Sequence, residues 1–150
     1  GLVADGYQIR NAIDVGCGSA ILAIGISKLW PVVEILACDN DPLAVETASE
    51  NVLKNDCAQA VKVFESDFYS ASEVSAISPF DLVVANILAG PLIGAAGATA
   101  KQVSPMGRLI LSGILNEQAA DVVAAHEIAG LTVIDHLEID EWTTLVLRLS

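Results

Sequence analysis

The sequence contains few basic residues. Only seven lysines and arginines stand against 19 aspartates and glutamates, which gives a formal net charge of −12. Binding to a nucleic-acid backbone needs a basic surface, so this composition argues against direct nucleic-acid contact. An acidic surface suits a cationic ligand or a basic protein partner, although solubility alone can also account for the charge.

Other signals are also missing. No apolar run reaches the roughly 18 residues of a membrane-spanning helix, so we expect no membrane association. No secretory or transit segment is visible at the N-terminus. Cys17, Cys38 and Cys57 share no metal-ligand spacing. We therefore expect reduced thiols in a cytoplasmic protein, and no metal site.

What is present is the composition of a globular domain. The 150 residues are 53% hydrophobic and only 17% charged. This composition argues against disorder and supplies enough apolar surface for a core. We expect residues 1–150 to form one domain.

Apolar runs alternate with helical patterns along the chain. The alternation predicts an α/β fold: a doubly wound, mostly parallel seven-stranded sheet with a C-terminal antiparallel hairpin. The expected strands cover residues 12–15, 33–38, 61–64, 81–86, 108–112, 131–138 and 142–149. The expected helices cover residues 21–29, 42 to about 55, 92–103 and 117–129, with residues 69–79 as a loop or weak helix.

Some local expectations accompany this scheme. Residues 1–10 are expected to be loosely organised, and residues 104–107, Ser-Pro-Met-Gly, to form a turn. We expect Asn116 to cap the helix that follows it. We expect Trp142, at the start of the last strand, to lie in the core.

A glycine loop follows the first strand. Asp14 is followed by Val15, Gly16, Cys17 and Gly18, and a helical pattern begins at Ile21. Glycines let the backbone turn sharply and approach a ligand, and the N-terminus of the next helix points its amides at that space. Such a loop is typical of nucleotide-binding α/β units, although a tight turn alone needs the same glycines.

Polar residues also stand at the ends of the next expected strands, which are otherwise apolar. They are Asp39, Asp67, Asn86 and the pair Ser112-Gly113. Ligands of open α/β sheets bind at the carboxyl ends of the strands, near the point where the strand order reverses. This concentration of polar residues predicts a binding site.

Each acidic residue has a possible role and an ordinary alternative. Asp39 lies 21 residues beyond Gly18, where an acid can accept hydrogen bonds from both hydroxyls of a ribose. Asp67 can accept from an adenine amine, and Asp14 can order the glycine loop by accepting its backbone amides. The alternative is a turn beside Asp41 for Asp39, and a turn or a helix cap for Asp67, whereas Asp14 can also lie near a positive centre.

Two other nucleotide-binding patterns fit poorly. A dinucleotide-binding loop has glycine or alanine where this chain has Ile21, and a phosphate-binding P-loop has a Gly-Lys pair that is absent. Acids at Asp14 and Asp39 without a phosphate-binding lysine suit a cofactor without phosphates. S-adenosylmethionine, with its cationic sulfonium, is such a cofactor, so the sequence predicts a methyltransferase domain.

The motifs resemble those of the seven-strand S-adenosylmethionine methyltransferases. In detail they are similar to the bacterial methyltransferases that modify lysines of the ribosomal protein at the base of the large-subunit stalk. The similar segments are Asp-Val-Gly-Cys-Gly-Ser from Asp14, Asp-Asn-Asp-Pro-Leu-Ala-Val from Asp39, Val-Ala-Asn-Ile-Leu-Ala from Val84 and Leu-Ser-Gly-Ile-Leu-Asn-Glu-Gln from Leu111. The resemblance extends from about Ala12 to Leu149.

The resemblance implies roles for individual residues. Gly16, Gly18 and Asp39 are implied to bind the cofactor, and Asn86 to face the reacting methyl group. The expected cofactor site consists of Asp14, Gly16, Cys17, Gly18, Asp39, Asn40, Asp67, Phe68 and Asn86, and the expected substrate site of Ile87 and Leu88.

The acceptor is expected to be an alkyl amine. A lysine amine must lose its proton before it can attack, and an apolar pocket favours the neutral form. Asn86 can accept a hydrogen bond from this amine and aim its lone pair. Ile87 and Leu88 follow it where enzymes that act on flat amides or bases usually carry proline and an aromatic residue.

We therefore expect an enzyme that methylates lysine amino groups of a basic, large-subunit ribosomal protein. A small-molecule or RNA methyltransferase is one alternative, and a cofactor-binding domain without activity is another. The sequence does not indicate an oligomeric state.

Two parts of the family pattern are not found in the sequence. The family carries a Gly-Thr-Gly-rich segment and a helix just before the first strand, and a small N-terminal domain that docks the ribosomal protein. Residues 1–10 contain neither, and Ala20 replaces the usual third glycine. We expect residues 1–150 to be a catalytic domain cut from a longer protein, or a degenerate relative of the family. We also expect an uncovered sheet face with an exposed apolar patch, and self-association.

Overall fold

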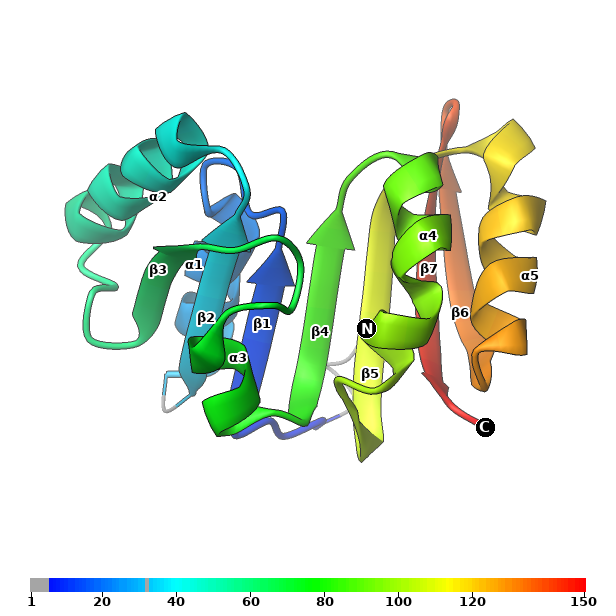
Figure 1. Cartoon of the computed structure of the whole chain (residues 1–150), viewed down its shortest axis with the longest axis horizontal. Helices are drawn as coiled ribbons and strands as arrows, with labels where there is room; N and C mark the ends of the chain where they lie inside the picture. The colour runs from blue at the N-terminus through cyan, green and yellow to red at the C-terminus, as the bar shows by residue number, and fades with distance from the viewer. Residues whose placement is uncertain (1–5, 32) are drawn as a thin grey trace.

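Seven strands form one mixed sheet in the computed structural model, which describes residues 6–31 and 33–150 (Figure 1). The strands are β1 (Asn11–Val15), β2 (Glu34–Asp39), β3 (Val61–Glu65), β4 (Phe80–Asn86), β5 (Val103–Leu115), β6 (Leu131–Ile139) and β7 (Trp142–Leu149). The helices are α1 (Ile21–Leu29), α2 (Pro42–Lys54), α3 (Ser72–Ile77), α4 (Ala89–Ala100) and α5 (Ala119–Ile128), with a short 3₁₀ helix at Asn116–Gln118.

The strand order is β3-β2-β1-β4-β5-β7-β6. β1 to β5 run parallel to one another, and β7 is antiparallel to both of its neighbours. The expected doubly wound sheet with its C-terminal hairpin is thus confirmed. The order reverses between β1 and β4, so the crevice at their carboxyl ends is where this topology places a ligand.

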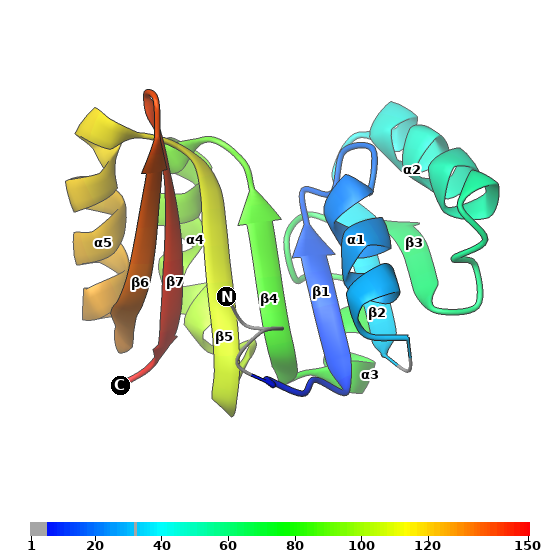
Figure 2. The same ribbon diagram turned by 180° about the vertical axis from the view of Figure 1, so that it is seen from behind.

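Successive residues of the central strands face opposite layers of the core. Ile13 and Val15 of β1 pack in the cluster under α3, α4 and α5, whereas Ala12 packs in the cluster under α1 and α2. Figures 1 and 2 show these two sets of helices on opposite faces of the sheet. Burial on both faces explains why β1 and β4 are continuous apolar runs.

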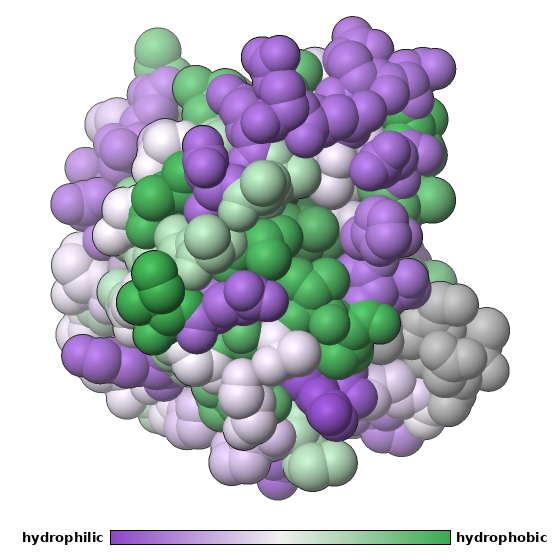
Figure 3. Space-filling view, turned by 90° about the vertical axis from the view of Figure 1, so that its right-hand side faces the viewer, coloured by the Kyte–Doolittle hydropathy of each residue, from purple (hydrophilic) through white to green (hydrophobic). Residues whose placement is uncertain are grey.

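The face of β5, β7 and β6 opposite α4 and α5 carries no helix in the part of the chain that the structure describes (Figure 2). β7 pairs Thr144 with Leu137 and Trp142 with Ile139, and paired residues share a face. Leu137, Ile139 and Trp142 are 58%, 60% and 47% exposed, so the expectation of a core position for Trp142 is wrong. Figure 3 views the β6 edge, where hydrophobic residues gather between hydrophilic ones. Self-association through such a surface stays a prediction.

The segment before β1 is better anchored than expected. The Tyr7 hydroxyl lies 2.8 Å from the Asp81 carbonyl oxygen and 2.9 Å from that of Met106, and Ile9 is buried. The indole of Trp30 donates to the Tyr7 carbonyl at 2.8 Å. The expectation of a loose segment is therefore wrong for residues 6–10, and residues 1–5 lie outside the described ones.

Two other local expectations are also wrong. Residues 104–107 do not form a turn between elements but a bulge inside β5, opposite Asp81, because Phe80 pairs with Val103 and Leu82 with Arg108. Asn116 does not cap a helix with its side chain. Its amide donates to the Asp140 carbonyl at 2.9 Å and accepts from the Thr143 hydroxyl at 2.8 Å, which ties it to the β6–β7 hairpin.

Helix α4 begins at Ala89, three residues before the expected position 92, and ends at Ala100. Within the described residues, no helix has the length and apolar character needed to cross a membrane.

Asp81, at the start of β4, connects this strand to the segment before β1 and to the start of β5. Its carboxylate accepts from the backbone amide and the Nε of Arg10, at 3.0 and 3.1 Å, and from the Ser104 hydroxyl at 2.9 Å. Burial alone raises the pKa of Asp81, but these hydrogen bonds together hold it below its usual value. The carboxylate is therefore charged in the folded chain.

We expect Asp81→Asn to lower the free energy of unfolding by about 1–3 kcal/mol, because a buried, charged hydrogen-bond acceptor is lost. The control is Glu50→Gln, which removes the exposed Glu50–Lys54 pair at 3.3 Å and should cost no more than about 0.5 kcal/mol. Urea denaturation measures both. Equal effects of the two substitutions would show that the Asp81 contacts do not stabilise the fold.

Candidate functional site

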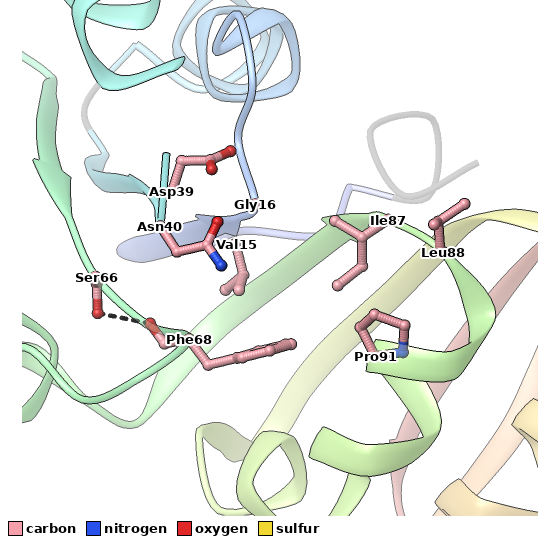
Figure 4. Close-up of a pocket in the computed structure, with 9 residues that line it drawn as sticks. All are labelled: Val15, Gly16, Asp39, Asn40, Ser66, Phe68, Ile87, Leu88 and Pro91. Atoms are coloured by element: carbon pink, nitrogen blue, oxygen red, sulfur yellow. Dashed lines mark hydrogen bonds between the residues drawn. The ribbon is translucent and has the colours of Figure 1, made fainter. Parts of the chain in front are cut away.

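A pocket of about 280 Å³ opens at the carboxyl ends of the parallel strands (Figure 4). It lies where the strand order reverses, as the topology requires. Its walls come from the ends of β1 and β2, the loop after β3, and the segment between β4 and α4. The lining residues are Val15, Gly16, Asp39, Asn40, Ser66, Phe68, Ile87, Leu88 and Pro91.

The glycine loop forms the sharp turn that the sequence predicts. Gly16 has a left-handed backbone with φ of 65°, and a β-carbon there would lie 2.5 Å from Cγ2 of Ile87. The Cys17 amide donates to the Cys38 carbonyl of β2 at 2.9 Å, which fixes the loop to the neighbouring strand. Glycine at position 16 is thus required both by its conformation and by the close approach of Ile87.

Asp39 faces the pocket and is held by two backbone amides. Its Oδ2 accepts from Gly18 and its Oδ1 from Asp41, both at 3.0 Å. The hydrogen bond from Asp41 shows that Asp39 also forms the turn that was the alternative to a ribose-binding role. Each carboxylate oxygen has accepted only one of these bonds, so both keep a lone pair for a ligand.

Asp14 does not line the pocket. It is 1% exposed, and its Oδ2 accepts from the amide of Ala23 in the first turn of α1 at 3.0 Å. The expectation that Asp14 accepts the amides of the glycine loop is therefore wrong: its bond is to the helix that follows the loop. Burial raises the pKa of Asp14 to about 7, opposed by the Ala23 hydrogen bond and assisted by Asp39.

All three cysteines are free and buried. Burial, with the nearby acids Asp14 and Asp39 adding to it, raises the pKa of Cys17 and Cys38 to about 12. A nucleophilic cysteine must be a thiolate. Neither residue is therefore suited to covalent catalysis.

The end of β4 forms the wall opposite Asp39. Ile87 and Leu88 line the pocket, and Leu88 is 73% exposed. Asn86 precedes them as an exposed residue at the strand end, paired in register with Ser112 of β5. It is next to the lining residues rather than one of them.

The structure brings together only some of the expected residues. Gly16, Asp39, Asn40, Phe68, Ile87 and Leu88 line the pocket, whereas Asp14, Cys17, Gly18, Asp67 and Asn86 do not. Gly18 contributes through its amide bond to Asp39. Asp67 is exposed and contributes its carbonyl to the turn, accepting from the Ser70 amide at 3.1 Å.

Three lining residues were not anticipated: Val15, Ser66 and Pro91. The Ser66 hydroxyl donates to the Phe68 carbonyl at 2.9 Å and accepts from the Ala71 amide at 3.2 Å, so it shapes the turn that presents Phe68. Val15 could have been predicted to line the pocket, because it directly precedes Gly16 at the end of β1. Ser66 reaches the pocket through the turn after β3, and Pro91 from the first turn of α4, a helix that the sequence pattern placed three residues too late.

We expect Asp14→Asn to flatten the pH dependence of stability. The folded chain holds the Asp14 proton up to about pH 7, whereas an unfolded aspartate loses it near pH 3.9. The free energy of unfolding should therefore fall as pH rises through this interval, by an amount on the order of a few kcal/mol. Urea denaturation at about pH 4.5, 6 and 7.5 measures it.

The control for this experiment is Asp135→Asn, which changes an exposed aspartate on β6. It should keep the wild-type slope. A wild-type slope in Asp14→Asn would contradict a raised pKa at this position.

Comparison with known proteins places this geometry in a family. The model of the family "Ribosomal protein L11 methyltransferase (PrmA)" matches residues 5–150. Ribosomal protein L11 methyltransferases from Chelativorans sp. (strain BNC1) and Brucella suis are 45% and 44% identical, over 93% and 92% of this chain. The chain spans about half of these relatives, 48% of each.

Solved structures agree with the fold. The crystal structure of a ribosomal protein L11 methylase from Lactobacillus delbrueckii subsp. bulgaricus has a TM-score of 0.83 at 25% identity, and covers 99% of this chain and 74% of its own. A precorrin-6y C5,15-methyltransferase from Geobacter metallireducens shares the fold alone, with a TM-score of 0.76 at 18% identity, covering 97% of this chain and 83% of its own. Because the family model matches almost the whole sequence, the chain belongs to the ribosomal protein L11 methyltransferase family.

Proposed function

We propose that this chain is the catalytic domain of an enzyme that transfers methyl groups from S-adenosylmethionine to lysine amino groups of a ribosomal protein. The observation that carries the proposal is the pocket at the β1/β4 reversal, with Asp39 on one wall and the end of β4 on the other. Family membership supports the same activity.

The pocket residues fit this cofactor better than a phosphorylated one. No lysine or arginine is among the lining residues, and the charged side chain that lines the pocket is the acid Asp39. Its two oxygens can accept from the ribose hydroxyls. Gly16 leaves space where a β-carbon would stand, and Val15 and Phe68 offer apolar surface for the adenine ring. When bound, S-adenosylmethionine supplies an electrophilic methyl group on a cationic sulfonium.

Asn40 and Gly18 complete the proposed cofactor site, with Asp14 and Cys17 in supporting positions. Asn40 lines the pocket beside Asp39, and the Gly18 amide fixes the Asp39 carboxylate. Asp14 anchors α1, and Cys17 anchors the loop to β2. Asp67 follows β3 as an exposed acid, and we propose that it accepts from the adenine amine.

The end of β4 is proposed to bind the acceptor amine. The Asn86 side-chain oxygen can accept a hydrogen bond from a neutral amine and so direct its lone pair. Ile87, Leu88 and Pro91 form an apolar surface beside it. An apolar surrounding lowers the pKa of an amine, which favours the neutral, nucleophilic form. The same surface suits the alkyl chain of lysine.

The protein partner is proposed to be basic. The net charge of −12 would attract a cationic ribosomal protein and repel RNA. The matched relatives are about twice as long as this chain. We propose that the remainder of the whole enzyme contributes to docking that substrate. A ribosomal-protein substrate also implies a cytoplasmic enzyme.

We expect Asp39→Ala to lower the affinity for S-adenosylhomocysteine by about 10–100-fold, because hydrogen bonds to a charged acceptor are lost. Asp39→Asn should lower this affinity by a smaller factor, since one acceptor oxygen remains. Isothermal titration calorimetry measures both variants beside the control Asp135→Ala, which should bind like the wild type.

An unchanged affinity in Asp39→Ala would contradict the proposed cofactor site. If the 150-residue chain itself does not bind, the titration is repeated on the whole protein. Absence of binding there would overturn the methyltransferase proposal.

We expect Asn86→Ala to reduce kcat about 100-fold while the affinity for S-adenosylhomocysteine changes less than about threefold, because positioning of the acceptor is lost and the cofactor walls are intact. Methyl transfer is measured with ribosomal protein, a free alkyl amine and RNA as acceptors. The control Asn55→Ala alters an exposed residue at the end of α2 and should keep the wild-type kcat.

The acceptor series separates the alternative functions. Transfer to RNA but not to protein would replace the proposed substrate, and transfer to the free amine alone would indicate a small-molecule enzyme. Cofactor binding without transfer by the whole protein would indicate a binding domain without activity.

A further inference from the structure

Ser112 and Gly113 form a bulge in β5 beside the end of β4. Leu111 pairs with Leu145 of β7 and Ile114 pairs with Thr143, so Ser112 and Gly113 together oppose a single residue. Gly113 has a left-handed backbone with φ of 77°. A bulge of this kind bends a strand and changes where its neighbours point.

Gly113 lies directly against Asn86. A β-carbon at position 113 would lie 2.7 Å from Oδ1 of Asn86, 3.0 Å from the carbonyl oxygen of Ile87 and 3.4 Å from its amide nitrogen. These distances leave no room for a side chain. The Asn86 side chain therefore lies against the backbone of Gly113, at the position that a side chain of residue 113 would occupy.

The bulge is held in place from its other side. The backbone amide of Asn116 donates to the Glu141 carbonyl at 3.0 Å, and its side chain bonds to Asp140 and Thr143. These contacts fix the chain just beyond the bulge to the β6–β7 hairpin. An atom added at Gly113 would therefore meet the Asn86 side chain first, at 2.7 Å, and the Ile87 carbonyl oxygen next, at 3.0 Å.

We propose that Gly113 is a positioning residue that sets the orientation of the Asn86 side chain, and through it the placement of the acceptor amine. The inference rests on the proposed function in one respect, the role of Asn86. Gly113 is not among the residues that line the cofactor pocket, so its substitution should affect turnover and spare cofactor binding.

The test compares Gly113→Ala with Gly130→Ala in the protein form that shows activity in the acceptor assay. Gly130 also has a left-handed backbone, with φ of 90°, but a β-carbon there would meet nothing within 4 Å. Both substitutions introduce the same kind of backbone strain, and only the first introduces a collision with Asn86.

We expect Gly113→Ala to reduce kcat about 100-fold, with affinity for S-adenosylhomocysteine within about threefold of wild type. Gly130→Ala should keep the wild-type kcat. The side-chain amide resonances of Asn86, assigned by NMR, should shift in Gly113→Ala and not in Gly130→Ala. Wild-type kcat and wild-type Asn86 resonances in Gly113→Ala would overturn the proposal.

A double-substitution cycle tests whether Gly113 acts through Asn86. In an Asn86→Ala background, adding Gly113→Ala should change kcat by less than about threefold, because the displaced atom is already gone. A further large loss would show that Gly113 acts by another route and would overturn the proposal. If Asn86→Ala alone leaves kcat unchanged, the catalytic role of Asn86 fails, and the resonance shift still decides whether Gly113 positions its side chain.

Folding of the variants is followed by urea denaturation. If Gly113→Ala does not fold, rescue of folding by Asn86→Ala supports a collision with the Asn86 side chain. If Asn86→Ala does not restore folding, the collision is with the Ile87 backbone. That result would overturn the proposal that Gly113 positions the Asn86 side chain.

Discussion

Ile87 lies between two glycines, and the candidate site depends on the absence of a side chain at both. Its Cγ2 occupies the space where a β-carbon of Gly16 would stand, and its backbone contacts Gly113. The ends of β1, β4 and β5 can approach one another only because these two positions are bare, with left-handed backbones that glycine adopts at low cost. One wall of the pocket and the position of Asn86 both follow from this contact.

The acids of the site accept hydrogen bonds from backbone amides and are not paired with cationic side chains. Asp14 accepts from the first turn of α1, and Asp39 accepts from Gly18 and Asp41. A helix N-terminus that would otherwise attract a phosphate therefore has a carboxylate among its own amides. Asp39 lines the pocket without a lysine or arginine beside it, which favours a ligand with a positive centre over one with phosphates.

The sequence predicts those features that depend on local pattern. The apolar runs of β1 and β4 are buried on both faces, and polar residues stand at their ends. These features were sufficient to predict the fold, the position of the crevice, and Ile87 and Leu88 in the pocket wall at the end of β4. Contacts between distant segments were not predictable: Tyr7 meets Asp81, and Asn116 turns to the β6–β7 hairpin. Trp142 was expected in the core from its position at the start of the last strand, but no helix covers its side of the sheet in the described residues. Ser66 reaches the site through a turn whose hydrogen bonds have no sequence signature.

In the proposed function, cofactor binding and methyl transfer depend on different strands of the sheet. The proposed contacts with the ribose and the adenine come from the ends of β1 and β2 and the loop after β3, whereas Asn86 belongs to β4 and lies against Gly113 of β5. The bulge of β5 is in turn fixed to the β6–β7 hairpin through Asn116. Cofactor affinity and catalytic rate should respond to different substitutions because different strands carry them.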